Sequence, residues 1–94
     1  MSRFTTRVEL YGNASESVYE KLHDKMYEKQ FYRNFTDNGV SYKMPSAMYF
    51  SSHQLTTMQV RDLAKSIAAT IWNDFAVLVT STEVRIEHYN LRKG

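Results

Sequence analysis

Hydrophobic and polar residues alternate strictly near the start of the chain. Every second residue from Phe4 to Leu10 falls on one side of an extended backbone, and the intervening residues are polar or charged. A period of two residues is the repeat of a β-strand, and a single polar side indicates that only one face is buried. We therefore predict a half-buried strand over residues 3–10.

Apolar residues later recur every three or four positions, which is the spacing of an amphipathic helix. In residues 14–29 these positions are Val18, Leu22 and Met26. Asn13 precedes Glu16 by three residues, which is the spacing of a capping box at a helix N-terminus. We therefore predict that Asn13 caps a helix over residues 14–29.

A second helix has stronger boundary signals. Thr56 and Gln59 fit a capping box, and a regular apolar stripe follows over residues 60–71. A stripe of this kind is buried when the helix packs on a sheet. We predict that this helix buries Leu63 and Ile67 completely.

The segment between the two helices predicts a β-hairpin. Residues 31–36 are rich in aromatic side chains, and a regular strand places Phe31 and Phe35 together on the core face. The sequence Asp-Asn-Gly that follows is a turn signal, because Asn and Gly tolerate a positive φ. The return strand is expected over residues 40–50, with a bulge or an edge position at Pro45 because proline lacks an N–H group.

Two further segments near the end of the sequence resemble strands. Residues 75–80 form an apolar run, and residues 83–89 alternate again, as a continuation of that strand or as a further strand folded back on it. The order β-α-β-β-α-β with right-handed crossovers predicts an α+β protein with a ferredoxin-like split βαβ sandwich, plus an additional or extended C-terminal strand. Both helices then cover one face of the sheet, and the other face is open or covered by a partner.

Composition limits the class of protein. The 94 residues are expected to form a single domain, 1–94, with an ordinary apolar content of 43%. There is no cysteine, which excludes disulfides and fits the cytoplasm. No apolar run approaches the ~20 residues that span a bilayer, so no membrane partner is expected. The net charge is only +2, so a nucleic-acid site must be a local patch.

Several short blocks of the sequence resemble one protein family. The blocks are "RFTTRVEL", "KLHDKMYEKQF", "DNGVSYKMPSAMYFSS" and "LTTMQVRDL". In order and character they are similar to the first strand, first-helix exit, hairpin and second-helix entry of the GhoS family. This family comprises endoribonuclease antitoxins of type V toxin–antitoxin systems in bacteria and their prophages. The resemblance covers almost the whole chain and implies a ferredoxin-like fold and cleavage of a toxin messenger RNA.

The resemblance also implies catalytic positions. Lys21 and His23 stand where the family carries two arginines in its first helix. Cleavage by internal transesterification needs a base for the 2′-hydroxyl proton and a cation for the phosphorane, so His23 and Lys21 are the catalytic candidates. Lysine lacks the bidentate fork of arginine, and histidine carries only partial charge near neutral pH. The alternative is that His23 packs its ring at the rim of the core.

Candidate RNA-binding residues lie on the outward face of the predicted sheet. Arg3 and Arg7 project from the first strand on the face that RNA-recognition modules of this topology use for single strands. Tyr32, with Tyr42 or Lys43 across the hairpin, would add a stacking surface and a further cation. The alternative for this face is a solvated surface with cross-strand Arg–Glu pairs.

No metal site or cofactor is expected from the sequence. His23, His53 and His88 lack the spacing of a metal-binding helix. A second class of function stays open, namely a non-enzymatic interaction module. Its open sheet or an edge strand, including residues 83–89, would pair with a second copy as a homodimer or with a host protein.

Overall fold

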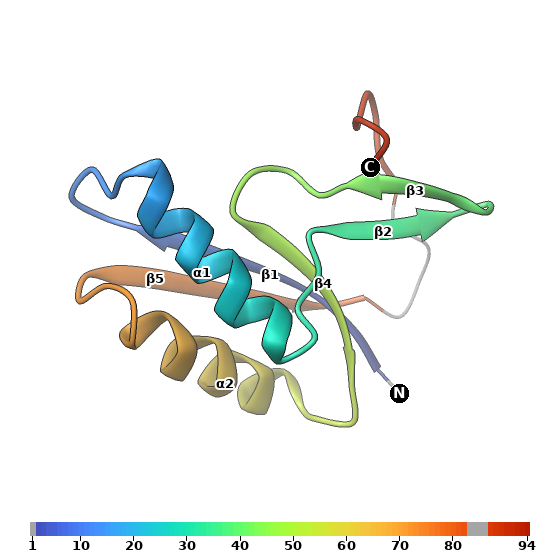
Figure 1. The fold of residues 1–94 in the computed structure, drawn as a ribbon. Coiled ribbons are helices and arrows are strands. Elements are labelled where there is room, and N and C mark those ends of the chain that lie inside the picture. The colour runs from blue at the N-terminus through green and yellow to red at the C-terminus, as the bar shows by residue number, and fades with distance from the viewer. Residues whose placement is uncertain (1, 83–86) are drawn as a thin grey trace.

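The computed structural model describes residues 2–82 and 87–94, and this part of the chain contains two helices and five strands (Figure 1). In chain order these elements are β1 Ser2–Leu10, α1 Glu16–Glu28, β2 Asn34–Asp37, β3 Val40–Lys43, β4 Met48–His53, α2 Thr57–Ala69 and β5 Phe75–Ser81. The predicted first strand, both helices and the strand over residues 75–80 are all present.

Strand β1 is the centre of a three-stranded antiparallel sheet with the order β4-β1-β5. Both helices cover the same face of this sheet, and β2 and β3 form a separate antiparallel hairpin beside it (Figure 1). The predicted α+β class and the placement of both helices on one face are therefore confirmed.

The alternation of residues in β1 sets its two faces. Phe4, Val8 and Leu10 are buried beneath the helices, whereas Arg3 and Arg7 are exposed on the opposite face. The rest of the buried core comes from both helices, β4 and the segment before β2: Leu22, Met26, Phe31, Tyr49, Val60, Ala64, Ile67 and Ala68.

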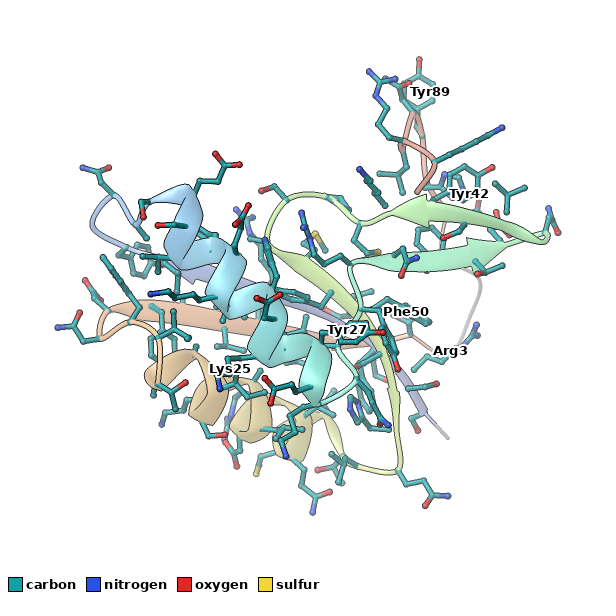
Figure 2. All side chains as sticks on the ribbon, viewed as in Figure 1. Arg3, Lys25, Tyr27, Tyr42, Phe50 and Tyr89 are labelled. Carbon is teal, nitrogen blue, oxygen red and sulfur yellow. The ribbon has the colours of Figure 1, made fainter. Side chains whose placement is uncertain are left out.

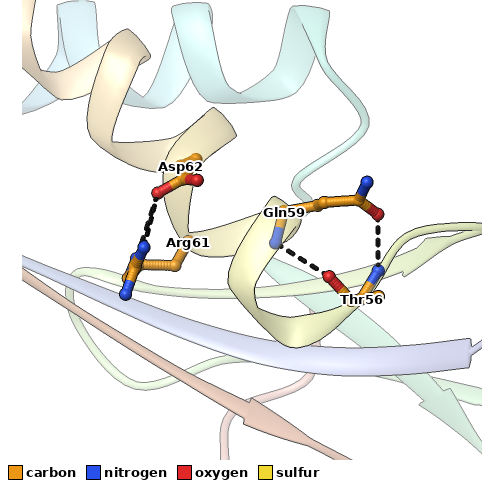
Figure 3. A network of polar contacts seen from close by, with 4 residues as sticks. All are labelled: Thr56, Gln59, Arg61 and Asp62. Carbon is orange, nitrogen blue, oxygen red and sulfur yellow. Dashed lines mark hydrogen bonds and ion pairs between the residues drawn. The ribbon is translucent and has the colours of Figure 1, made fainter.

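The two helices begin in different ways. The capping box of α2 is present as predicted: the Thr56 side chain accepts from the Gln59 N–H at 3.1 Å, and the Gln59 side chain accepts from the Thr56 N–H at 2.9 Å (Figure 3). The prediction that Asn13 caps α1 is wrong, because Asn13 has a φ of 61° in the preceding turn. Ser15 is the N-cap instead, and its side chain accepts a hydrogen bond from the Val18 N–H.

The burial of α2 differs at one position from the prediction. Ile67 is 8% exposed and belongs to the core, as predicted. Leu63 is only half-buried against that core, and with Ile67 it lines a shallow hollow between the two helices, so the apolar stripe of α2 is not covered across its whole width. Complete burial therefore holds for Ile67 and is wrong for Leu63.

Phe31 and Phe35 do not share one core, although both are buried. The backbone bends at Arg33 before β2 begins, so the two-residue register of a strand is interrupted. Phe31 packs under the helices, while the ring of Phe35 lies 6.2 Å from that of Phe50. Because Phe50 alternates with the core residue Tyr49 along β4, this contact is on the opposite face of the sheet.

The predicted return strand is divided into two elements. β3 ends at Lys43, and β4 begins at Met48 after a turn in which the Met48 N–H donates to the Pro45 carbonyl at 3.0 Å. Ala47 has a φ of 61°, which a strand does not accommodate. The sequence indicated the position of this interruption correctly, but a single strand over residues 40–50 is wrong.

The predicted strand over residues 83–89 lies mostly outside the described residues. Residues 87–89 are described and are not a strand. Further along, Lys93 pairs with Tyr42, the Lys43 N–H donates to the Arg92 carbonyl at 2.8 Å, and the Gly94 N–H donates to the Ser41 carbonyl at 3.1 Å. The last residues of the chain therefore pair with the hairpin through β3.

Removing a buried side chain of α2 tests its packing on the sheet. We expect Ile67→Ala to lower the free energy of unfolding by ~2–5 kcal/mol, because it leaves a cavity in the core. Met58→Ala is the control, since Met58 lies on the same helix and is 63% exposed; its effect should stay within ~0.5 kcal/mol. Urea unfolding measures both, and a loss below ~1 kcal/mol for Ile67→Ala would contradict this packing.

Candidate functional site

One edge of β1 lacks a strand partner beyond Arg7. The ladder between β1 and β4 ends at the pair of Arg7 with Met48, so among the described residues no strand covers this edge from Val8 to Leu10. The backbone N–H of Val8 donates instead to the Ala47 carbonyl at 3.0 Å. The N–H of Leu10 donates to the Tyr19 hydroxyl at 3.0 Å. These two bonds satisfy the edge without a strand, and space remains between α1 and the β3–β4 turn.

A cleft of about 590 Å³ occupies this space. It is lined by residues of β1, the segment before α1, the first two turns of α1, the bend before β2 and the β3–β4 turn: Arg7, Glu9, Ala14, Glu16, Tyr19, Glu20, His23, Arg33, Ser46 and Ala47. The lining therefore combines two guanidinium groups, one imidazole and three carboxylates. This set can move a proton and can hold an anion.

His23 is held by a hydrogen bond from the floor of the core. Its Nδ1 lies 2.6 Å from the hydroxyl of Tyr49, whose side chain is fully buried on β4. The two rings meet edge to face, with centroids 5.7 Å apart. The hydrogen bond fixes the imidazole plane and leaves Nε2 as the nitrogen not used by Tyr49.

The surroundings of His23 favour its neutral form. Burial is the main cause that lowers the pKa of His23 from its ordinary value of 6.5, and the Arg33 guanidinium lowers it further, while Asp24 raises it. Burial likewise raises the pKa of Tyr49 well above its ordinary value, so its hydroxyl keeps its proton. A neutral imidazole beside a protonated phenol is suited to accept a proton at neutral pH.

Arg33 is a cation of the cleft that was not predicted from the sequence as a site residue. A regular strand would have placed it on the core side, but the bend turns it into the cleft. The bend is fixed by backbone hydrogen bonds on both sides: Tyr32 and Phe50 exchange two, at 2.8 and 2.6 Å, and the Met44 N–H donates to the Arg33 carbonyl at 2.6 Å. An arginine at a core position of an aromatic strand was the available signal of an irregular backbone.

Only some of the predicted site residues come together. Arg7 and His23 share the cleft, whereas Lys21 is exposed on α1 and does not line it. Arg3 pairs with Ser52 near the N-terminal end of β1, where Figure 2 labels it, and is not among the residues that line the cleft.

The predicted hairpin residues also separate. Tyr42 is half-buried, and its ring lies 4.6 Å from that of His88, so it belongs to the small aromatic cluster around Phe35. Tyr32 is more exposed and meets Tyr27 edge to face at 5.5 Å. Lys43 is exposed at the end of β3.

The other two histidines have structural partners. His53 is buried in the core, its Nε2–H donates to the Lys29 carbonyl at 3.0 Å, and its ring lies 5.0 Å from Phe31. His88 pairs with Asp37 at 3.2 Å and connects the end of the chain to the hairpin. Within residues 2–82 and 87–94, no group of three or more His, Asp or Glu side chains is placed to hold a metal ion.

Comparison with known proteins adds no assignment. No known protein family has a sequence profile that matches the chain, and no curated protein matches it. Among the described residues, neither helix has the length and apolar character needed to cross a membrane.

The environment of His23 can be measured directly. We expect NMR titration of its ring protons to give a midpoint below 6.5, because burial and Arg33 both disfavour the imidazolium. Arg33→Gln should raise the midpoint. Arg61→Gln, which removes an equal charge from α2 outside the cleft lining, should leave it unchanged. A midpoint above 6.5 in the unmodified protein would contradict the described environment.

Proposed function

We propose that this protein binds single-stranded RNA and cleaves it in the cleft beside α1, as an endoribonuclease antitoxin similar to the GhoS family. The proposal rests on one observation above all: a hydrogen-bonded imidazole and two guanidinium groups, His23, Arg7 and Arg33, line the same cleft. A base and cations are the groups that transesterification of RNA requires.

In this proposal His23 acts as the base. This role requires the tautomer in which the Nδ1–H donates to the Tyr49 oxygen, because Nε2 is then free to accept the proton of the ribose 2′-hydroxyl. The 2′-oxygen then forms a bond to the adjacent phosphorus while the bond from phosphorus to the 5′-oxygen breaks. The products are a 2′,3′-cyclic phosphate and a 5′-hydroxyl, whose proton comes from water in the open cleft. Arg7 and Arg33 stabilise the negative charge of the phosphorane.

The carboxylates of the cleft limit how tightly it can hold a phosphate. Glu9, Glu16 and Glu20 line it together with Arg7 and Arg33, so negative side chains outnumber the guanidinium groups. The negative charges of these carboxylates repel a phosphate and weaken its binding, and salt screens this repulsion. Much of the affinity for RNA must therefore come from residues outside this cleft.

We also propose that the fold is the ferredoxin-like split βαβ sandwich. The order β4-β1-β5 accounts for three of its four strands. The bridge between Tyr32 and Phe50 supports the fourth, because it sets the segment before β2 against the outer edge of β4. In this arrangement β3 is an addition that completes the hairpin.

The pH dependence of cleavage separates a base from a cation at position 23. We expect cleavage of a mixed-sequence RNA pool to increase as the pH rises through a value below 6.5, because the neutral imidazole is the active form. Cleavage should persist in EDTA, since side chains supply all the groups of the mechanism. A rate that instead decreases through this pH range would assign His23 as a phosphate-binding cation.

Two substitutions complete this test. His23→Ala should reduce the rate by about 10²-fold or more, the usual contribution of a general base. His23→Arg restores the residue found in the GhoS family and should also abolish cleavage if the imidazole is the base. Equal cleavage by the unmodified protein and both variants would show that His23 only packs at the rim of the core.

A second candidate function is an interaction module, and the edge strand β5 favours it. Among the described residues β5 pairs only with β1, and its seven residues carry no charge. Leu78 at its centre is 67% exposed. Exposed edges normally carry charges or bulges that prevent pairing with other chains, and this edge has no charge.

Pairing of β5 with a second copy would bring two Leu78 side chains together at the centre of an antiparallel ladder. We then expect sedimentation equilibrium to give twice the monomer mass and Leu78→Lys to give the monomer, because two like charges would face each other. Thr80→Lys serves as the comparison, because it places a lysine on the same face of β5 but farther from the centre of the ladder. A monomer at every concentration of the unmodified protein would exclude a homodimer through β5.

A further inference from the structure

A second, smaller cleft lies on the other side of Arg33. Its volume is about 190 Å³, and Arg33, Asn34, Lys43, Met44 and Gly94 line it. Two of these side chains are cationic and none is acidic, so the cleft stays positively charged even when the backbone carboxylate of Gly94 is counted, whereas carboxylates outnumber the guanidinium groups in the first cleft. The second cleft is therefore the more favourable of the two for an anion.

Arg33 lines both clefts and connects them. Its position is set by the backbone rather than by a flexible loop, because the residues on either side of it are bonded to β4 and to the end of the hairpin. The Met44 N–H donates to the Arg33 carbonyl at 2.6 Å, and Tyr32 is bridged to Phe50. An arginine that lines two adjacent clefts can contact successive phosphates of one strand.

Lys43 is placed at the second cleft by its neighbours on both sides. Across the hairpin it pairs with Asn34, and its N–H donates to the Arg92 carbonyl at 2.8 Å. The stem of its side chain lies against Gly94. Among the described residues, no carboxylate forms an ion pair with Arg33, Lys43 or Arg92. Arg33 and Lys43 both line this cleft, and two cations that share a cleft repel one another and favour a bound anion.

We infer that the second cleft binds a phosphate of the same RNA strand whose neighbouring linkage occupies the first cleft. This inference rests on the proposed function and deepens it. The substrate is then a single strand that passes from His23, across Arg33, to Lys43, and not across the outer face of the sheet near Arg3. The second cleft supplies affinity and register, while the first supplies the chemistry.

The experiment uses an RNA that the protein can bind but not cleave. A fluorescent unstructured oligonucleotide of about 12 nucleotides with 2′-O-methyl groups lacks the attacking hydroxyl, so binding is measured alone by anisotropy over a range of salt concentrations. The variant is Lys43→Gln, which removes the charge and keeps most of the side-chain stem that packs against Gly94. The matched control is Lys65→Gln, because Lys65 is exposed on α2 and lines neither cleft.

We expect Lys43→Gln to weaken binding roughly fivefold at low salt, the effect of losing one exposed phosphate contact. The slope of log affinity against log salt should fall by about 0.7, the value per phosphate for a single strand. Lys65→Gln should change neither quantity. Far-ultraviolet circular dichroism and the unfolding midpoint confirm that both variants are folded.

The possible failures are distinguishable. If the unmodified protein binds RNA but Lys43→Gln behaves like Lys65→Gln, the second cleft is not a phosphate site, and the proposed function still stands. If the unmodified protein does not retain the oligonucleotide at low salt, both the inference and the proposed function are overturned. Equal weakening by both lysine variants would indicate non-specific attraction and would also overturn the inference.

Discussion

The incomplete pairing of β1 is the constraint from which the candidate site follows. β4 covers one edge of this strand only as far as Arg7, and the remaining edge is satisfied by the Ala47 carbonyl and the Tyr19 hydroxyl. A longer β4 would fill this space with backbone and remove the cleft. Buried or half-buried backbone groups need partners, so the turn and α1 must stay close to the edge. On α1, His23 lines this cleft and is hydrogen-bonded to the hydroxyl of Tyr49.

The bend at Arg33 is the second determinant, because it divides an aromatic segment between two faces of the sheet. Phe31 completes the core under the helices, and Phe35 joins Phe50, Tyr42 and His88 on the opposite side. The charged residue between them is turned outward, to a position beside both clefts. A local interruption of strand register thus produces the aromatic cluster of the hairpin and also the cation that, in addition to burial, lowers the pKa of His23.

The periodicity of the sequence was sufficient to predict β1, α1 and α2 and the face that each of them buries, because each buries one regular stripe. It failed where the backbone leaves the regular repeat. Phe35 was assigned to the wrong core because the bend at Arg33 has no glycine or proline to signal it. The cap of α1 is Ser15 and not Asn13, because Asn13 lies in the preceding turn with a left-handed φ. The cleft was not predictable, because it depends on where the pairing of β4 ends.

The proposed occupancy of both clefts by one RNA strand, joined at Arg33, can be tested in solution. The most direct measurement is the change in backbone amide NMR shifts when a 2′-O-methyl single-stranded RNA is added. If RNA occupies both clefts, the largest changes map to the residues around His23, Arg33 and Lys43, with little change along β5. Changes confined to β5 and Leu78, or the absence of any change at low salt, would contradict it.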